Sequence, residues 1–274
     1  MTDLVVREYG TGREQVIVLH GGPAAAGDVA PLAEALGKRW HAFEPFQRTS
    51  GSSPLTVSRH VQDLDNLIRE RCSGGQPVLA GHSWGAMLAL AYAAEQPKAP
   101  AALVLVGCGT FSERARAEFE ARLAARLTPA QRAKIADIRQ SEADADRRLA
   151  AMGRMMTQVY GHDVEEVAES AVLVDARAHE ETWADMIRLQ REGVYPSALA
   201  AIDVPVLMLH GAADPHPGRL ICEDLRTYIP HLQYHEMPEC GHSPWLERRA
   251  REPFLEMLNT WLAKIFSEPS IRQA

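Results

Sequence analysis

The sequence predicts an α/β protein with a mostly parallel, doubly wound sheet that is interrupted by a helical insertion. Short apolar runs alternate with helix-like segments at both ends of the chain, which is the pattern of a parallel sheet. The turn Gly81-His82-Ser83-Trp84-Gly85 joins one such run to a segment rich in Ala and Leu. Between residues 111 and 196 no strand-like run of comparable strength occurs. We therefore expect a core formed by residues 1–109 and 197–274, with a helical cap over residues 110–196.

The apolar runs place the strands in order along the chain. The run over residues 15–19 is continuous in its apolar character, so we expect it to be buried on both faces. The expected strands cover residues 4–9, 15–19, 40–43, 78–80, 102–106, 204–209 and 233–237. The expected core helices cover residues 30–36, 57–71, 86–94, 219–228 and 253–266.

The insertion has the spacing of amphipathic helices. Apolar residues recur every four positions over residues 111–127, and Thr128-Pro129 is typical of a helix start. Further helical stretches are expected over residues 164–174 and 180–189. We expect the arginines of the first helix to form a solvated face rather than an anion site. These arginines are Arg114, Arg122 and Arg126. The cluster Met152, Met155 and Met156 would form an adaptable apolar wall if it faces a cleft.

Length and composition limit the class of protein. The chain has 274 residues, of which 46% are hydrophobic, enough for one large domain with an insertion. The formal net charge of -7, with acids and bases mixed, argues against a nucleic-acid binder. The four cysteines form no C-x-x-C pair, and the start Met1-Thr2-Asp3-Leu4 lacks the features of a signal peptide. We expect reduced thiols, no membrane span and a cytoplasmic protein.

The turn around Ser83 has the pattern G-x-S-x-G. With a strand before it and a helix after it, this pattern predicts a nucleophile elbow, whose strained backbone pushes the serine hydroxyl out of the sheet edge. Glycine at positions 81 and 85 removes side chains that would collide as strand and helix close on each other. The amide of Trp84, at the start of the helix, is expected to donate to a developing oxyanion.

A serine nucleophile needs a base, and the base needs a group that orients it. His242 follows the expected strand 233–237, and Asp214 follows the expected strand 204–209. Both residues should therefore lie at the carboxyl edge of the sheet, where an open parallel sheet carries its ligand-binding loops. We predict Ser83 as nucleophile, His242 as base and Asp214 as the orienting acid.

Three other histidines lie near these motifs. His82 is expected to pack and form hydrogen bonds inside the elbow, because adjacent side chains in a turn diverge. His20 is expected to stabilise the loop after its strand. His216 is a cleft residue that competes with His242 for the role of base, although it lies too close to Asp214 to belong to a separate loop.

A second oxyanion donor is expected from the glycine loop His20-Gly21-Gly22-Pro23, which lies between a buried strand and a helix. We assign this donor to the Gly22 amide. His231 and His235 straddle the start of a strand rather than one helix face, so a zinc site is not expected. No metal or organic cofactor is implied.

Across nearly its whole length the chain resembles the alpha/beta-hydrolase superfamily, in which nucleophile, acid and base follow one another in this order. Within it, three stretches resemble the proline iminopeptidase branch: His20-Gly21-Gly22-Pro23, Ser83-Trp84-Gly85 and Gly241-His242-Ser243. The resemblance implies a Ser83, Asp214, His242 triad with amide donors at Gly22 and Trp84.

The chain departs from that branch at several positions. Ala24 and His82 stand where the branch has glycine, and Phe46-Gln47-Arg48-Thr49 replaces its Asp-Gln-Arg-Gly loop. Those peptidases hold the free amine of a substrate with acidic groups in the cap. Candidates here are Glu180, Glu181 and Asp185.

These features predict a serine hydrolase that cleaves a small ester or amide through an acyl-enzyme. An aminopeptidase releasing an N-terminal residue is the first alternative, and cleavage of carbon-carbon bonds in diketones on the same triad stays open. A non-catalytic ligand-binding protein on this fold is the alternative from another class. The expected partner is a small-molecule substrate, without nucleic acid or membrane, and we expect a monomer or a homodimer.

Overall fold

A computed structural model describes residues 4–72, 76–165 and 173–267. Its main sheet has seven strands in the order β1-β4-β2-β5-β6-β8-β9, and only β1 runs antiparallel to its neighbour. The strands are β1 (Val6–Tyr9), β2 (Gln15–Leu19), β4 (His41–Pro45), β5 (Val78–His82), β6 (Ala102–Val106), β8 (Val206–Gly211) and β9 (Gln233–Met237). Each expected strand is present, so the predicted mostly parallel sheet is confirmed.

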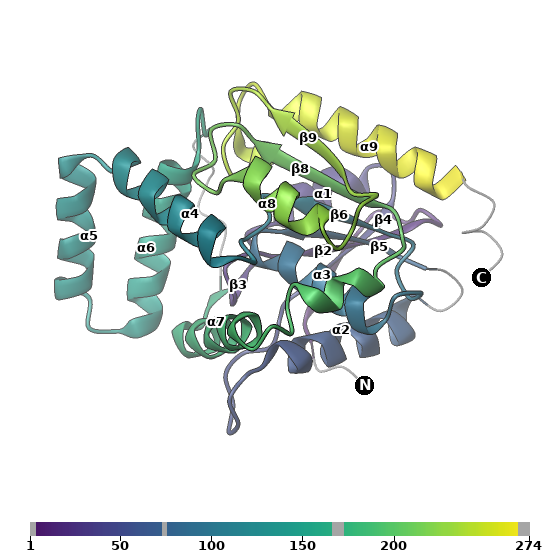
Figure 1. Cartoon of the computed structure of the whole chain (residues 1–274), viewed down its shortest axis with the longest axis horizontal. Coiled ribbons are helices and arrows are strands. Elements are labelled where there is room, and N and C mark those ends of the chain that lie inside the picture. Colours follow the sequence, from purple (N-terminus) through teal and green to yellow (C-terminus); the bar gives the residue numbers. More distant parts are fainter. Residues whose placement is uncertain (1–3, 73–75, 166–172, 268–274) are drawn as a thin grey trace.

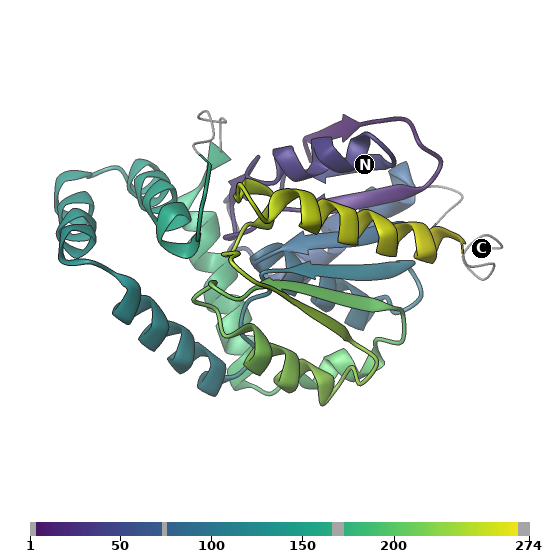
Figure 2. The same cartoon turned by 90° about the horizontal axis from the view of Figure 1, so that it is seen from above.

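Helices cover both faces of this sheet (Figure 2). One apolar cluster gathers residues of α2, α3 and α8, and the second gathers residues of α1 and α9. Strand β2 alternates between the two clusters, with Ile17 in the first and Val16 in the second, and both side chains are fully buried. This confirms the prediction that this strand is buried on both faces. The helices are α1 (Ala30–Gly37), α2 (Val57–Arg71), α3 (Trp84–Glu95), α8 (Gly218–Arg226) and α9 (Arg251–Ser267).

The segment between β6 and β8 carries α4 (Glu113–Arg126), α5 (Pro129–Ser141), α6 (Ala145–Tyr160) and α7 (Ala176–Arg191). In Figures 1 and 2, α4, α5 and α6 stand to one side of the sheet. The predicted start of α5 is confirmed, because Thr128 and Gln131 form a capping box with proline at the first turn. That residues 110–196 form a separate cap stays a prediction.

One expected helix of the insertion is wrong where the structure describes it. Residues 166–172 lie outside the described residues, but β7 (Leu173–Val174) is a short strand that pairs with β3 (Ala25–Ala26). The strand forms because its backbone finds a partner next to the glycine loop 20–23, a long-range contact that overrides local helical preference.

Helix α7 is fastened to the body of the protein by packing and by hydrogen bonds. Met186 is fully buried in the cluster that contains α2 and α3. Three carboxylates of the α7 segment accept hydrogen bonds from backbone amides of the loop before α2 and of its first residue, at 2.7 to 2.9 Å. The pairs are Asp175 with Ser50, Glu181 with Leu55 and Asp185 with Val57.

All four cysteines are buried and unpaired, as predicted. Among the described residues, no helix is both long and apolar enough to cross a membrane.

Candidate active site

Ser83 lies between β5 and α3 with backbone angles φ 54° and ψ -115°, a conformation that residues other than glycine rarely adopt. A Cβ on Gly81 would lie 2.2 Å from the Gly85 carbonyl oxygen, and a Cβ on Gly85 would lie 2.2 Å from the Leu19 carbonyl oxygen. Both positions therefore require glycine for the strand and helix to approach. The predicted strand-turn-helix around Ser83 is confirmed.

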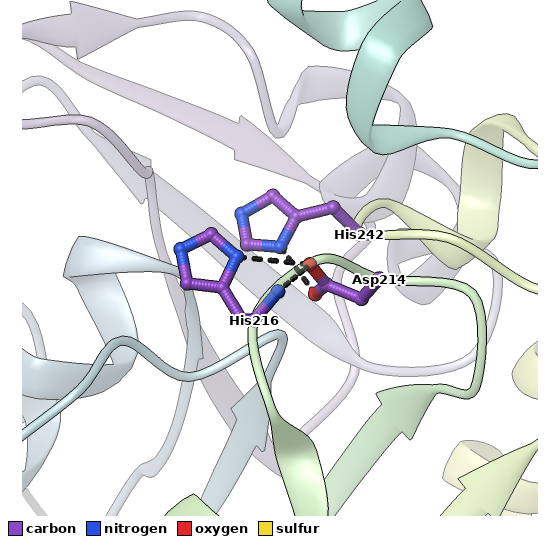
Figure 3. Close-up of side chains that lie close together, drawn as sticks. All are labelled: Asp214, His216 and His242. Carbon is purple, nitrogen blue, oxygen red and sulfur yellow. Dashed lines mark hydrogen bonds and ion pairs between the residues drawn. The ribbon is translucent and has the colours of Figure 1, made fainter. Parts of the chain in front are cut away.

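Asp214 and His242 lie in contact, from the loops that follow β8 and β9. The Nδ1–H of His242 donates to Asp214 Oδ2 at 2.6 Å, and both residues are buried (Figure 3). Because this bond uses Nδ1, the second ring nitrogen of His242, Nε2, remains available for another hydrogen bond. The prediction that these two side chains meet at the carboxyl edge of the sheet is confirmed.

The end of β6 lies between the elbow and His242 and contacts both. The Ser83 amide donates to the Val106 carbonyl at 2.8 Å, and the next residue, Gly107, is so close that a Cβ there would lie 2.9 Å from His242 Nδ1. Within the described part of the chain, however, no hydrogen bond joins the Ser83 hydroxyl to His242. The structure thus brings Asp214 and His242 together and places Ser83 beside them, next to the carboxyl end of β6.

A buried carboxylate, which the sequence analysis did not single out, holds the His242 loop. Glu247 accepts hydrogen bonds from the amides of Gly241 and His162 at 2.9 Å and from the amide of Asp163 at 2.6 Å. It joins the loop that carries His242 to the segment that follows α6.

Two further histidines surround Asp214. His216 donates to Asp214 Oδ1 through its backbone amide and its Nδ1, each at 2.9 Å. His210 Nε2 lies 3.3 Å from Asp214 Oδ2 and 3.0 Å from the His216 carbonyl. Burial alone would raise the pKa of Asp214, but the electrostatic influence of the neighbouring His242, His216 and His210 imidazoles outweighs burial and holds that pKa well below its usual range. His216 is therefore a partner of the acid rather than a base on a separate loop, and His210 was not predicted.

His82 and His20 have the structural roles predicted for them. His82 Nε2 lies 3.2 Å from the His242 carbonyl, so His82 fastens the elbow to the loop that carries His242. Burial lowers the pKa of His82 despite the Asp28 carboxylate at 3.8 Å. His20 Nε2 accepts a hydrogen bond from the Gln47 amide at 3.0 Å, and burial lowers its pKa as well.

The two predicted oxyanion donors lie on neighbouring loops. Trp84 is the first residue of α3, and its amide donates to no acceptor in the part of the chain that the structure describes. Gly22 has φ 29°, and a Cβ there would meet only Ala25, at 4.0 Å, so the space above it is open. A Cβ on the adjacent Gly21 would lie 3.2 Å from the Ser83 Cβ, which places this loop beside Ser83.

Gln47 connects these donor loops and was missed by the sequence analysis. Its Oε1 accepts from the Trp84 indole at 2.8 Å, and its Nε2 donates to the His20 carbonyl at 3.1 Å. Its neighbour Arg48 forms a bidentate ion pair with Asp63 at 2.6 and 2.7 Å. The Gln-Arg pair that this chain shares with the iminopeptidase loop was the signal that could have identified Gln47.

The expectation of a solvated arginine face on α4 is wrong for Arg126. Its guanidinium donates to the carbonyls of Ala213 and Gly161, so it binds the loops next to Asp214 and at the end of α6. Arg122 pairs with Glu118 on the exposed face, as expected. Arg126 differs because its position at the end of α4 lies against the sheet edge.

A metal ion does not fit the cluster of Asp214, His216 and His242. Ligand atoms of the three residues lie within 4.8 Å of one another. The two imidazoles, however, are stacked with centroids 4.5 Å apart and an interplanar angle of 18°. Each Nδ1 already donates its hydrogen to Asp214 and so offers no lone pair to a metal ion (Figure 3).

Several proteins with similar sequences are hydrolases. The chain is 25% identical over 277 residues to a proline iminopeptidase of Lactobacillus delbrueckii subsp. lactis, covering 92% of this chain and 91% of the relative. It is also 25% identical over 278 residues to a 2-hydroxy-6-oxononadienedioate/2-hydroxy-6-oxononatrienedioate hydrolase of Pseudomonas putida, covering 93% and 90%.

Solved structures share the fold. A thermophilic esterase from Thermogutta terrifontis has a TM-score of 0.63 at 21% identity and covers 96% of this chain and 93% of its own. A monoacylglycerol lipase of Paleococcus ferrophilus has a TM-score of 0.61 at 18% identity and covers 96% and 99%. The sequence model of the Alpha/beta hydrolase family matches residues 16–254. With its sheet order, elbow and paired acid and histidine, the chain belongs to the alpha/beta hydrolase family.

Proposed function

We propose that the protein is a serine hydrolase that uses Ser83 as nucleophile, His242 as base and Asp214 as the acid that orients the base. The observation that carries the proposal is the buried 2.6 Å bond between His242 Nδ1 and Asp214, beside a serine held at positive φ. That bond holds His242 in the tautomer whose bare Nε2 can accept the proton of the serine hydroxyl.

The reaction follows from these roles. His242 takes the Ser83 proton as the serine oxygen attacks the acyl carbon, and the amides of Gly22 and Trp84 hold the negative oxygen of the tetrahedral intermediate. His242 then gives its proton to the leaving group, and an acyl-enzyme forms. Water, activated by the same imidazole, releases the acid. The buried Asp214 carboxylate stabilises the imidazolium in both steps.

We propose an ester with an uncharged acyl group as the substrate, because the cap acids that could hold an amine are engaged or exposed. Glu181 and Asp185 accept hydrogen bonds from backbone amides at the start of α2 and pair with Arg177 and Arg188. Glu180 is exposed on α7. The relatives named as esterase and lipase support this substrate class, and the relative named as an iminopeptidase keeps the aminopeptidase as the rival.

The test compares a p-nitrophenyl ester of a short fatty acid with a prolyl arylamide, using wild type, Ser83→Ala and Ser58→Ala. Ser58 is exposed on α2, so its variant is the matched control and should behave like wild type. We expect ester turnover that falls about a thousandfold or more in Ser83→Ala. A higher kcat/KM for the prolyl arylamide would make the aminopeptidase the function. Ester turnover that survives in Ser83→Ala, or is absent from folded wild type, would contradict the proposal.

A further inference from the structure

Asp214 accepts hydrogen bonds from two imidazoles, whereas a catalytic triad needs only one. His242 Nδ1 donates to Oδ2 at 2.6 Å, and His216 Nδ1 donates to Oδ1 at 2.9 Å (Figure 3). Each carboxylate oxygen thus accepts a hydrogen bond from one histidine ring, and a third ring, that of His210, places its Nε2 3.3 Å from Oδ2. In Figure 3 the second ring nitrogen of each histidine points to the same side, away from the carboxylate. The proposed reaction assigns no task to His216.

The His216 ring is also the middle layer of an aromatic stack. It lies 4.5 Å from the His242 ring at 18°, and 4.2 Å from the Phe119 ring at 19°. Tyr160 places its edge against both imidazoles, with centroids 5.6 Å from His216 and 5.4 Å from His242. Since Phe119 belongs to α4 and Tyr160 to α6, two helices of the insertion contact the rings that bind Asp214.

We propose that His216 is a positioning residue for the base His242. The Nδ1 donor of His216 draws negative charge toward Asp214 Oδ1. Less negative charge is then available at Oδ2, the oxygen that accepts from His242. Through its flat face His216 fixes the plane of the His242 ring, and through Phe119 it connects that plane to α4. This inference rests on the proposed function of His242 as base.

Few other ionisable groups can change charge next to His242. His82 faces it from the end of β5, and His210 reaches Asp214 from β8. Burial lowers the pKa of both, so they stay neutral through the neutral range. Burial raises the pKa of the Tyr160 hydroxyl to about 12, so it also stays neutral. Two charged groups lie one residue further away: Arg126 donates to the Ala213 carbonyl, and Asp28 lies 3.8 Å from His82 Nδ1. Among the described residues, Asp214 binds His242 directly and His216 stacks on its ring.

Two substitutions separate the two effects of His216. His216→Phe keeps a flat ring between Phe119 and His242 but removes the Nδ1 donor to Asp214, while the backbone amide of residue 216 still donates to Oδ1. We expect the ascending limb of the kcat/KM profile for an ester to move to higher pH by about half to one unit, because the imidazolium of His242 gains a stronger partner. His216→Asn keeps a donor near the Nδ1 position but removes the stack. We expect its limb to stay in place and its kcat to fall about tenfold, because the base loses its fixed plane.

The control is His235→Phe, which changes an exposed histidine on β9 and should leave both quantities at the wild-type values. A second readout is independent of turnover: the low-field proton resonance of the His242 Nδ1–H, recorded in Ser83→Ala. We expect His216→Phe to move it downfield and His216→Asn to leave it near its place. Unchanged limb, kcat and resonance in both variants would overturn the positioning role. Absent ester turnover in wild type would instead refute the proposed function, and the resonance would still test the coupling of His216 to His242.

Discussion

Gly85→Ala is the substitution that most sharply tests how the elbow is built. The added Cβ would lie 2.2 Å from the Leu19 carbonyl oxygen and 2.7 Å from the His20 carbonyl oxygen. Ordinary van der Waals contact begins at 3.4 Å, so α3 must move away from β2 by about 1 Å. Both obstacles are backbone atoms of a buried central strand, and no side chain can rotate to relieve the contact.

The cost follows from what α3 buries. Every residue from Trp84 to Ala93 is buried, so a shift of the helix loosens packing along most of its length. We expect the free energy of unfolding to fall by about 3 kcal/mol or more. This corresponds to a decrease of about 150-fold in the ratio of folded to unfolded protein. Ester turnover should fall as well, because the Trp84 amide moves with the helix.

Gly153→Ala is the matched control. Gly153 lies inside α6, and a Cβ there meets no atom within 4 Å. Because alanine favours a helix more than glycine does, this variant should be more stable by about 1 kcal/mol. Urea unfolding followed by tryptophan fluorescence measures both changes at constant m. Gly85→Ala with a free energy of unfolding within about 0.5 kcal/mol of wild type would refute this account of the elbow.

Three further predictions concern charge and hydrogen bonding. Asp214→Asn should lower kcat for an ester about a thousandfold or more with little change in KM, because the amide no longer selects the His242 tautomer with a bare Nε2; a loss below tenfold would contradict this. Burial lowers the pKa of His60 to about 4, so between pH 6.5 and 4 the unfolded chain binds a proton that the folded chain does not. Stability should therefore fall by about 3 kcal/mol over that range as the pH is lowered, and His60→Asn should remove this part of the slope in urea titrations; an unchanged slope would exclude His60 as its source. Gln47→Leu should reduce kcat about tenfold while KM changes little, because the Gln47 side chain no longer connects the loops that carry the Trp84 and Gly22 amides. Steady-state ester kinetics measure this change. A kcat equal to that of wild type would contradict the connecting role of Gln47.

The sheet and the loops at its edge could be predicted because their signals are local. Continuous apolar runs identify buried strands whatever their partners, and the polar loops after them hold Asp214 and His242. The elbow could be predicted for the same reason, since Gly81 and Gly85 are required by a turn of a few residues.

The contacts that join the insertion to the site could not be predicted, because each depends on which distant groups meet. Arg126 binds two backbone carbonyls, and nothing in its helix distinguishes it from Arg122, which stays on the surface. The acids of α7 likewise use their oxygens on backbone amides far along the chain. His216 and Asp214 are only two residues apart in the sequence. Even so, it is the stack of the His216 ring on Phe119 that shows this ring to be part of the site.

The most direct test of the proposed mechanism is mass spectrometry of the folded protein after reaction with a fluorophosphonate. An activated serine beside a neutral imidazole attacks such a reagent, whereas an ordinary serine hydroxyl does not. We predict a single adduct, mapped to the peptide that contains Ser83 and absent from Ser83→Ala. An adduct on another residue, or no adduct on folded wild-type protein, would contradict the assignment of Ser83 as the nucleophile.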